Sequence, residues 1–142
     1  MHLRQGIVLS KKGGALARML LPFKLGLGGK QGSGKQWMSW IAKADEVGAI
    51  RHAIENRGVE GPVNCTAPVP VTNADFARTL GDALHRPTVL PTPLLPLKLR
   101  YGGELVETLL LVSQRVAPAK LEATGYEFAC RSLGDAFAEI LN

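Results

Sequence analysis

The sequence predicts an α/β fold, in which a few short strands are covered by helices. Short apolar runs at 3–9 and 61–67 begin near glycines and have the length and composition of strands. Amphipathic segments at 45–56 and 72–86 alternate with these runs, and their apolar residues recur with the helical period. The run from Ile7 to Leu9 is continuously apolar, as in a strand buried on both faces of a parallel sheet. A length of 142 residues is that of one ordinary domain.

The first half of the chain predicts a helix and then a hairpin. Ala15 to Lys24 is apolar with helical spacing, and Pro22 near its end indicates a short helix. The segment 25–34 is rich in glycine, and Trp37 to Ile41 has the residues of a strand. Together these two segments predict a β-hairpin with a loose tip.

Two helices are predicted in the middle of the chain. Asp45 has the side chain of an N-cap for a helix through Asn56, and the predicted buried face of that helix holds Val47, Ile50 and Ile54. A capping-box pattern at Thr72–Asp75, with aspartate in place of the usual glutamate, opens the next helix. Pro87 ends that helix. Its predicted inner stripe consists of Phe76, Leu80, Ala83 and Leu84.

The last third of the chain predicts an extended connection followed by helices. Four prolines between Pro87 and Pro96, without Gly or Ser, are typical of an ordered, extended segment. Apolar spacing predicts a helix around 105–112. Ser132 is the predicted cap of a terminal helix, whose inward residues are Phe137, Ile140 and Leu141.

The composition excludes several classes of protein. With 46% hydrophobic and 20% charged residues, the chain can build a core and is not a disordered tail. The formal net charge is +5, but Lys and Arg occur in dispersed pairs, so we expect no nucleic-acid partner. No stretch approaches the roughly 18 apolar residues of a membrane helix, so we expect no membrane partner. Cys65 and Cys130 are expected to be buried and reduced, which favours a soluble cytoplasmic protein.

Two glycine patterns resemble nucleotide-binding loops without satisfying them. Gly29 to Gln36 is one residue short of a phosphate loop, because Gln36 stands where a Ser or Thr must bind magnesium. A helix must follow that loop, whereas Trp37 to Ile41 is strand-like. Gly26, Gly29 and Gly32 match the spacing of a dinucleotide loop, but again no helix follows. Glycines that permit positive φ in turns are the favoured interpretation.

No recognisable catalytic set is present in the sequence. His2, His52 and His85 are far apart and have no partners at metal-ligand spacing. Neither Tyr101 nor Tyr126 has a lysine four residues later, as a tyrosine–lysine pair would require. We therefore predict no catalytic residue and no metal site in this chain.

Several ordered stretches carry a family resemblance that covers nearly the whole chain. They are Arg4–Leu9, Gly13–Leu16, Pro22–Gly29, Gly32–Ile41, Gly61–Asn64, Ala67–Asn73, Arg86–Pro87, Ser113–Pro118, Lys120–Leu121 and Gly125–Tyr126. Together they resemble the carboxy-terminal half of the NAD(P)-dependent epimerase/dehydratase-like family. This family is the atypical extended short-chain dehydrogenase group often called sugar-nucleotide epimerase.

The resemblance implies a division of the fold and the place of the cofactor. Residues 1–90 would form the end of a Rossmann-like sheet with a substrate-binding hairpin and helices, and residues 91–142 a small carboxy-terminal helical module. Members of the family carry a Rossmann domain before this region, so the chain is expected to be a fragment or truncated product with an incomplete sheet. The complete family member would bind NAD or NADP, and we expect no cofactor site in this chain.

The resemblance also implies substrate contacts. By position, Gln36, Ser39 and Trp40 would line the substrate cleft, and Arg115 would bind an anionic group such as a diphosphate. The guanidinium of Arg115 suits bidentate phosphate contact, although pairing with a surface carboxylate is an equally valid interpretation. The chain departs from the family at Ala42, where a histidine is usual, and at Met38, where nucleotide-sugar epimerases often have an arginine.

Three hypotheses follow from the sequence. The leading one is a substrate-binding half that takes a small, anionic or nucleotide-linked molecule and needs a Rossmann half, in cis or from another chain. The second is a non-enzymatic binding or assembly module that dimerises through the unpaired strand at 3–9. The third is a nucleotide triphosphatase that uses Gly29 to Gln36.

Overall fold

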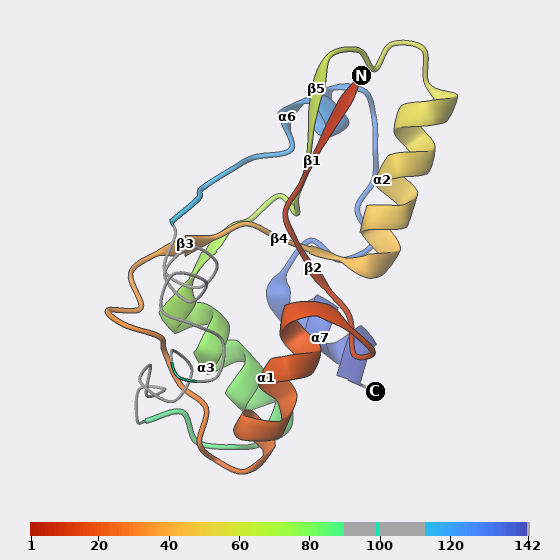
Figure 1. Cartoon of the computed structure of the whole chain (residues 1–142). Helices are drawn as coiled ribbons and strands as arrows, with labels where there is room; N and C mark the ends of the chain where they lie inside the picture. Colours follow the sequence, from red (N-terminus) through yellow and green to blue (C-terminus); the bar gives the residue numbers. More distant parts are fainter. Residues whose placement is uncertain (90–98, 100–112, 142) are drawn as a thin grey trace.

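The computed structural model describes residues 1–89, 99 and 113–141 (Figure 1). The extended segment predicted up to Pro96 and the helix predicted around 105–112 therefore lie almost entirely outside the described residues. In chain order the described elements are β1 (His2–Gln5), β2 (Ile7–Leu9), α1 (Gly14–Lys24), β3 (Trp37–Met38), β4 (Trp40–Ala42), α2 (Lys43–Glu55), β5 (Pro62–Cys65), β6 (Val71–Thr72), α3 (Asn73–Leu84), α6 (Ala119–Ala123) and α7 (Leu133–Leu141).

The predicted first strand is divided in two at Gly6. β1 pairs in parallel with β5, and β2 pairs in parallel with β4. The change of partner occurs within two residues, because the Gly6 N–H donates to Cys65 O at 3.0 Å and the Ile7 N–H donates to Ser39 O at 2.8 Å. A Cβ at position 6 would lie 2.6 Å from Ser39 O and 2.9 Å from Thr66 Cγ2. Glycine is therefore required at this crossing point.

The β2–β4 pair separates two apolar cores (Figure 1). Because side chains alternate along a strand, Trp40 and Ala42 enter the core formed with α1, α3 and α7. Ile41 points the other way, into the core formed with α2, β5 and α6. The prediction of a strand buried on both faces is thus confirmed for β2, whereas β1 is largely exposed and buries only part of Leu3.

The predicted hairpin is wrong. β3 pairs antiparallel with β6, and β4 pairs with β2, so the 37–42 segment finds both partners elsewhere in the chain. The glycine-rich segment is held instead by the start of α3. Asn73 Oδ1 accepts the N–H of Gln31 at 2.6 Å, and Gly34 O accepts the N–H of Ala74 at 2.9 Å. These contacts are distant in sequence, which is why local turn signals could not predict them.

The predicted cap and buried face of α2 are also wrong. Ala42 occupies the N-cap position without a side-chain cap, and Asp45 lies inside the first turn, where it is buried. The buried face carries small residues such as Ala49, while Val47 is 59% exposed and Ile54 is 70% exposed. Small residues on that face let α2 pack closely against β4 and β5.

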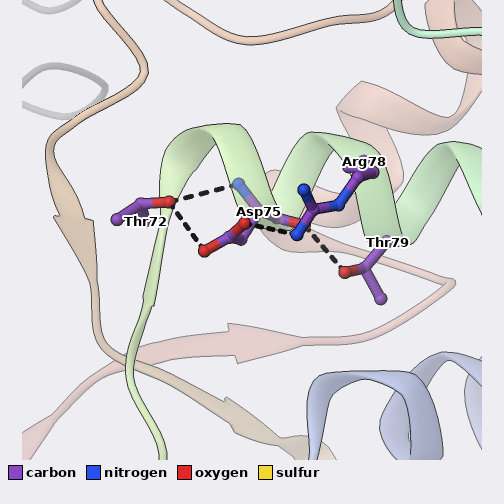
Figure 2. Close-up of polar contacts among 4 residues, drawn as sticks. All are labelled: Thr72, Asp75, Arg78 and Thr79. Atoms are coloured by element: carbon purple, nitrogen blue, oxygen red, sulfur yellow. Dashed lines mark hydrogen bonds and ion pairs between the residues drawn. The ribbon is translucent and has the colours of Figure 1, made fainter.

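The predicted capping box of α3 is confirmed, and Figure 2 shows its contacts. Thr72 Oγ1 accepts the N–H of Asp75 at 3.2 Å and lies 3.0 Å from Asp75 Oδ2. Asp75 also forms an ion pair with Arg78, at 2.6 Å. On the inner stripe Phe76 is buried as predicted, whereas Ala83 is exposed because α3 turns its Ala77 face to the core.

The carboxy-terminal helix α7 completes the first core. Ser132 Oγ accepts the N–H of Asp135 at 3.2 Å, which confirms the predicted cap. Phe137 is buried and packs edge-to-face on Phe76, with ring centroids 5.4 Å apart. Both cysteines are buried, as predicted, and they do not form a disulfide with each other. Within the described ranges, no helix combines the length and the apolar character needed to span a membrane.

Candidate functional site

The segment 113–117, which we call the strap, runs alongside β3 and the residue that follows it (Figure 1). The N–H of Trp37 donates to Ser113 Oγ at 3.0 Å, and Trp37 O accepts the N–H of Gln114 at 3.1 Å. These two bonds join segments more than 70 positions apart in the chain. The first half of the strap is thus fixed to β3 through the backbone N–H and C=O groups of Trp37.

Ser39 fixes the centre of the strap. Its hydroxyl donates to Gln114 O at 2.8 Å and accepts the N–H of Val116 at 2.9 Å. The two bonded groups lie on either side of Arg115, so one buried side chain sets the backbone position of that arginine. A hydroxyl that both donates and accepts is needed here, because each of the two backbone groups requires the opposite partner.

The far end of the strap is attached to β5 and the residue after it. Asn64 Nδ2 donates to Ala117 O at 3.3 Å, and Thr66 Oγ1 donates to Val116 O at 3.4 Å. The strap therefore bridges the end of β3 and the end of the β1–β5 pair. Its two attachments leave the Arg115 side chain exposed between them.

Arg115 stacks on an aromatic ring. Its guanidinium carbon lies 4.5 Å from the centre of the Trp37 ring, which is within the range of a cation–π contact. No carboxylate among the described residues forms an ion pair with Arg115. A guanidinium carries its N–H donors in a planar fork, and that fork matches a carboxylate or phosphate.

The structure brings Ser39 and Arg115 together but places Gln36 and Trp40 elsewhere. Trp40 is fully buried in the first core and donates from Nε1 to Val69 O at 2.9 Å. Gln36 is buried and donates from Nε2 to Gln31 O at 2.9 Å, which supports the glycine-rich loop. Because residues 36, 38 and 40 share one face of the strand segment, they face away from residues 37 and 39.

Sequence reasoning missed Trp37, which supplies the aromatic platform for Arg115. The signal was present, because residues two apart on a strand point to the same side. Once Ser39 is a candidate site residue, strand alternation places Trp37 on the same side and Trp40 on the opposite side. The loop anchor Asn73 was also missed, since only its distant bond to Gln31 reveals its role.

The glycine-rich loop does not fit the pyrophosphate of a dinucleotide. Gly26 and Gly32 adopt the predicted positive φ, at 76° and 59°, whereas Gly29 does not, and the chain continues into β3 instead of a helix. The nearby amino terminus of α3 is already occupied, because Gln36 O accepts the N–H of Asn73 at 2.8 Å and Gly34 O accepts that of Ala74. The first two backbone N–H groups of α3 are therefore already bonded within the chain.

Burial keeps the cysteines and Tyr126 protonated. It raises the pKa of Cys65 to about 11 and that of Cys130 to about 12, and it raises the pKa of Tyr126 with help from the neighbouring Asp45. None of these groups is poised as a nucleophile or base near neutral pH. In the part of the chain that the structure describes, no three His, Cys, Asp or Glu side chains gather to hold a metal ion.

Comparison with known proteins identifies relatives along nearly the whole chain. A family model described as a domain of unknown function, DUF1731, matches residues 92–140. Epimerase family protein Mb2239 of Mycobacterium bovis is 45% identical over 133 residues, which cover 94% of this chain and 44% of that protein. Human epimerase family protein SDR39U1 is 44% identical over 138 residues, which cover 97% of this chain and 47% of that protein.

Solved structures agree with these relatives. The crystal structure of human SDR39U1 (isoform 2) with NADPH superimposes with a TM-score of 0.89 at 43% identity, over 97% of this chain and 46% of that one. Over nearly its whole length the chain is thus similar to the SDR39U1-like epimerases. The nucleoside-diphosphate sugar epimerase of Corynebacterium glutamicum gives a TM-score of 0.74 at 34% identity, over 98% of this chain and 25% of that one.

These comparisons confirm the resemblance and the α/β fold class predicted from the sequence. More distant epimerases share the fold, such as the UDP-glucose 4-epimerase of Thermotoga maritima, with a TM-score of 0.64 at 18% identity. The chain spans just under half the length of the first curated relatives that it matches.

Proposed function

We propose that this chain is the substrate-binding half of an NAD(P)-dependent epimerase, and that the Arg115–Trp37 stack binds an anionic group of the substrate. The strap supports this proposal most directly, since Ser39 and Trp37 hold Arg115 in place before any ligand arrives. A preorganised guanidinium loses little conformational entropy on binding. A flexible arginine loses more, and this loss weakens its affinity. The anion it fits is a phosphate or diphosphate, bound through two parallel N–H bonds.

The class of substrate follows from the relatives as well as from the site. The Corynebacterium relative is described as a nucleoside-diphosphate sugar epimerase, and its diphosphate group has the chemistry that Arg115 would recognise. In our proposal the sugar-nucleotide lies across the strap and β3. The chain's own residues position the molecule, and they include no described base or nucleophile in reach of it.

The cofactor is proposed to bind mainly outside this chain. The human relative has been crystallised with NADPH, and this chain corresponds to 46% of that protein. The glycine-rich loop here does not fit a pyrophosphate, so we assign the dinucleotide contacts to a Rossmann half, in cis or on another chain. NAD(P)H supplies hydride transfer when it is bound to such a protein.

Binding of phosphate ligands tests the role of Arg115. Isothermal titration with pyrophosphate and with UDP-glucose is expected to show binding that Arg115→Ala weakens at least about tenfold, since charge-assisted bonds contribute roughly 1.5–3 kcal/mol each. Arg115→Lys is expected to recover part of the loss, because lysine keeps the charge but not the fork. The matched control is Arg51→Ala, an exposed arginine that forms an ion pair with Glu55 on α2.

Two results would overturn the proposal. One is equal affinity of the wild-type chain and Arg115→Ala for both ligands, and the other is no binding by the wild type. Titration with NADP(H) and NAD(H) tests the cofactor assignment separately. Micromolar binding of either dinucleotide to this chain alone would contradict that assignment.

A second candidate function is a binding or assembly module that acts without chemistry. The observation that favours it is the edge of β1, which pairs with only one strand, β5, among the described residues. Sedimentation distinguishes the two functions. A stable dimer with no affinity for phosphate ligands would favour assembly, and a monomer that binds them would favour the substrate-binding half.

A further inference from the structure

Glu46 is a buried carboxylate without a partner. It lies in the first turn of α2, is only 6% exposed, and neither of its carboxylate oxygens has a hydrogen bond within the described structure. Native proteins almost always satisfy buried polar groups, and an unpaired buried charge is among the most costly arrangements. The residue therefore indicates a missing partner.

The surroundings of Glu46 lie beneath the end of β1. Gln5 approaches the carboxylate closely enough to lower its pKa in part, although burial has the larger effect and raises that pKa overall. Cys65, the register partner of Gln5 on β5, is close enough to feel the charge. Glu46 is thus placed under the carboxyl ends of the parallel β1–β5 pair.

The β1 strand above Glu46 has an open edge. The N–H groups of His2 and Gly6 donate to the β5 side, so those of Leu3 and Gln5 point to the opposite edge. No strand among the described residues occupies that edge. Leu3 packs into the core beside α2, so the side chain of Gln5, two residues later, lies on the α2 face, where Glu46 is. The open edge and the unpaired carboxylate are therefore neighbours.

We propose that a strand from the Rossmann half pairs along the open edge of β1 and that its segment brings an arginine or lysine to Glu46. The inference rests on the proposed function, which requires such a half. The chain corresponds to less than half of its relatives, so each of them has more than enough additional sequence to supply the strand. A cationic donor would turn an unsatisfied charge into a paired one, which is a large change in a desolvated place.

A second copy of this chain is the less suitable occupant. Two copies related by a twofold axis would pair their β1 edges with each other, and each would bring its own Glu46 to the same interface. Two like charges would then approach in a poorly solvated region, which opposes association. Charge complementarity therefore favours a partner with a basic side chain.

The test uses a full-length chimera in which this chain replaces the matching 133-residue region of the M. bovis relative Mb2239. Glu46→Gln removes the charge with little change of shape, and Glu55→Gln is the control, since Glu55 is exposed on the same helix. In the isolated chain at pH 8, Glu46→Gln is expected to lower the unfolding equilibrium constant about tenfold, by removing an unpaired buried charge. In the chimera it is expected to raise that constant at least about tenfold, because it breaks the new pair.

The sign of the effect decides the outcome. Stabilisation by Glu46→Gln in both proteins, or no effect in the chimera, would overturn the proposal, as would a chimera that fails to fold while the isolated chain folds. Titration of the Glu46 side-chain carboxyl by carbon NMR gives a second readout, with a pKa expected to be lower in the chimera than in the isolated chain. Loss of phosphate binding would refute the proposed function but would leave this sign unchanged.

Discussion

Asp45 and Glu46 are neighbouring acidic residues in one helical turn, and their surroundings differ completely. Asp45 is 1% exposed, and its carboxylate accepts the N–H groups of Ala129 and Cys130, at 2.8 and 2.9 Å, and the hydroxyl of Tyr126, at 3.0 Å. Glu46 is 6% exposed and accepts no hydrogen bond from any residue that the structure describes. The difference lies in what each residue faces and not in its burial.

The two carboxylates face different parts of the chain, and only one of these parts supplies hydrogen-bond donors. Asp45 faces the carboxy-terminal segment 126–130, which returns to α2 and supplies every donor that the carboxylate needs. Glu46 faces β1, where the sheet ends among the described residues. On this helix the carboxylate of Asp45 has its hydrogen-bond donors, whereas that of Glu46 has none among the described residues. We therefore expect substitution of Asp45 to lower the free energy of unfolding and substitution of Glu46 to raise it.

The largest expected effect is the loss of Asp45. Asp45→Ala leaves the N–H groups of Ala129 and Cys130 without the carboxylate that accepts them, which costs about 2–4 kcal/mol at roughly 1–3 kcal/mol per group. Urea unfolding followed by circular dichroism measures the change. Asp45→Asn keeps one acceptor oxygen and is expected to lose less. Equal stability of Asp45→Ala and the wild type would show that these bonds do not hold the carboxy-terminal segment.

Replacement of Glu46 is expected to stabilise the isolated chain. Glu46→Leu removes an unpaired buried charge and should raise the free energy of unfolding by about 1–3 kcal/mol at pH 8. The effect depends on pH, because the folded-state pKa of Glu46 lies above its ordinary value of 4.5. The native state therefore binds more protons than the unfolded state just above pH 4.5, so the contribution of Glu46 to stability falls as pH rises through the folded-state pKa.

Unfolding curves recorded from pH 4 to pH 8 would show this decline in the wild type and a smaller one in the Leu variant. Cys65, the titrating neighbour, has a pKa of about 11 and does not contribute in this range. Identical pH profiles for the two proteins would mean that Glu46 already has a partner.

Removal of one of the donors that bind the Asp45 carboxylate should lower the free energy of unfolding moderately. Tyr126→Phe keeps the ring, which packs edge-to-face on Phe128 at 4.8 Å, and deletes only the hydroxyl that donates to Asp45. The expected cost is about 1 kcal/mol, typical of one hydrogen bond. Thermal unfolding measures it, and in an Asp45→Ala background the cost should be smaller but not zero, because the hydroxyl can still donate to the backbone O of residue 45 at 3.1 Å. If Tyr126→Phe destabilises the wild type and the Asp45→Ala variant equally, the hydroxyl does not act through the Asp45 carboxylate.

The smallest effect is expected for a solvated carboxylate in the first turn of another helix. Asp75 of α3 is paired with Arg78 (Figure 2), and the two side chains are 46% and 70% exposed. Arg78→Ala is therefore expected to cost no more than about 0.5 kcal/mol. Chemical denaturation measures the free energy of unfolding. A decrease of more than about 1 kcal/mol would show that solvent exposure does not explain why Asp75 contributes less to stability than Asp45.

Local signals in the sequence predicted what local contacts determine. Thr72 and Asp75 satisfy each other within one turn, so their pattern alone revealed the cap. Asp45 has the same residue type near a helix start, but its partners are more than 80 positions away, and the pattern was misread. The hairpin prediction failed for the same reason, because β3 and β4 both choose distant partners.

The candidate site was predictable only in part. Ser39 and Arg115 came from a family resemblance, and the structure joins them through the strap. Trp37 followed from strand alternation once Ser39 was chosen, and the same rule placed Trp40 in the core. The need for a partner at Glu46 could not be foreseen, because a sequence does not show which of two adjacent carboxylates will find donors.

Gly6 lies next to residues that hold both the strands and the strap in place. The atoms that leave no room for a side chain there belong to Ser39 and Thr66, and both of these residues also bind the strap that carries Arg115. Any larger residue at position 6 would displace the arginine as well as distort the strands. The position of Arg115 is thus coupled to a residue that lies outside the strap.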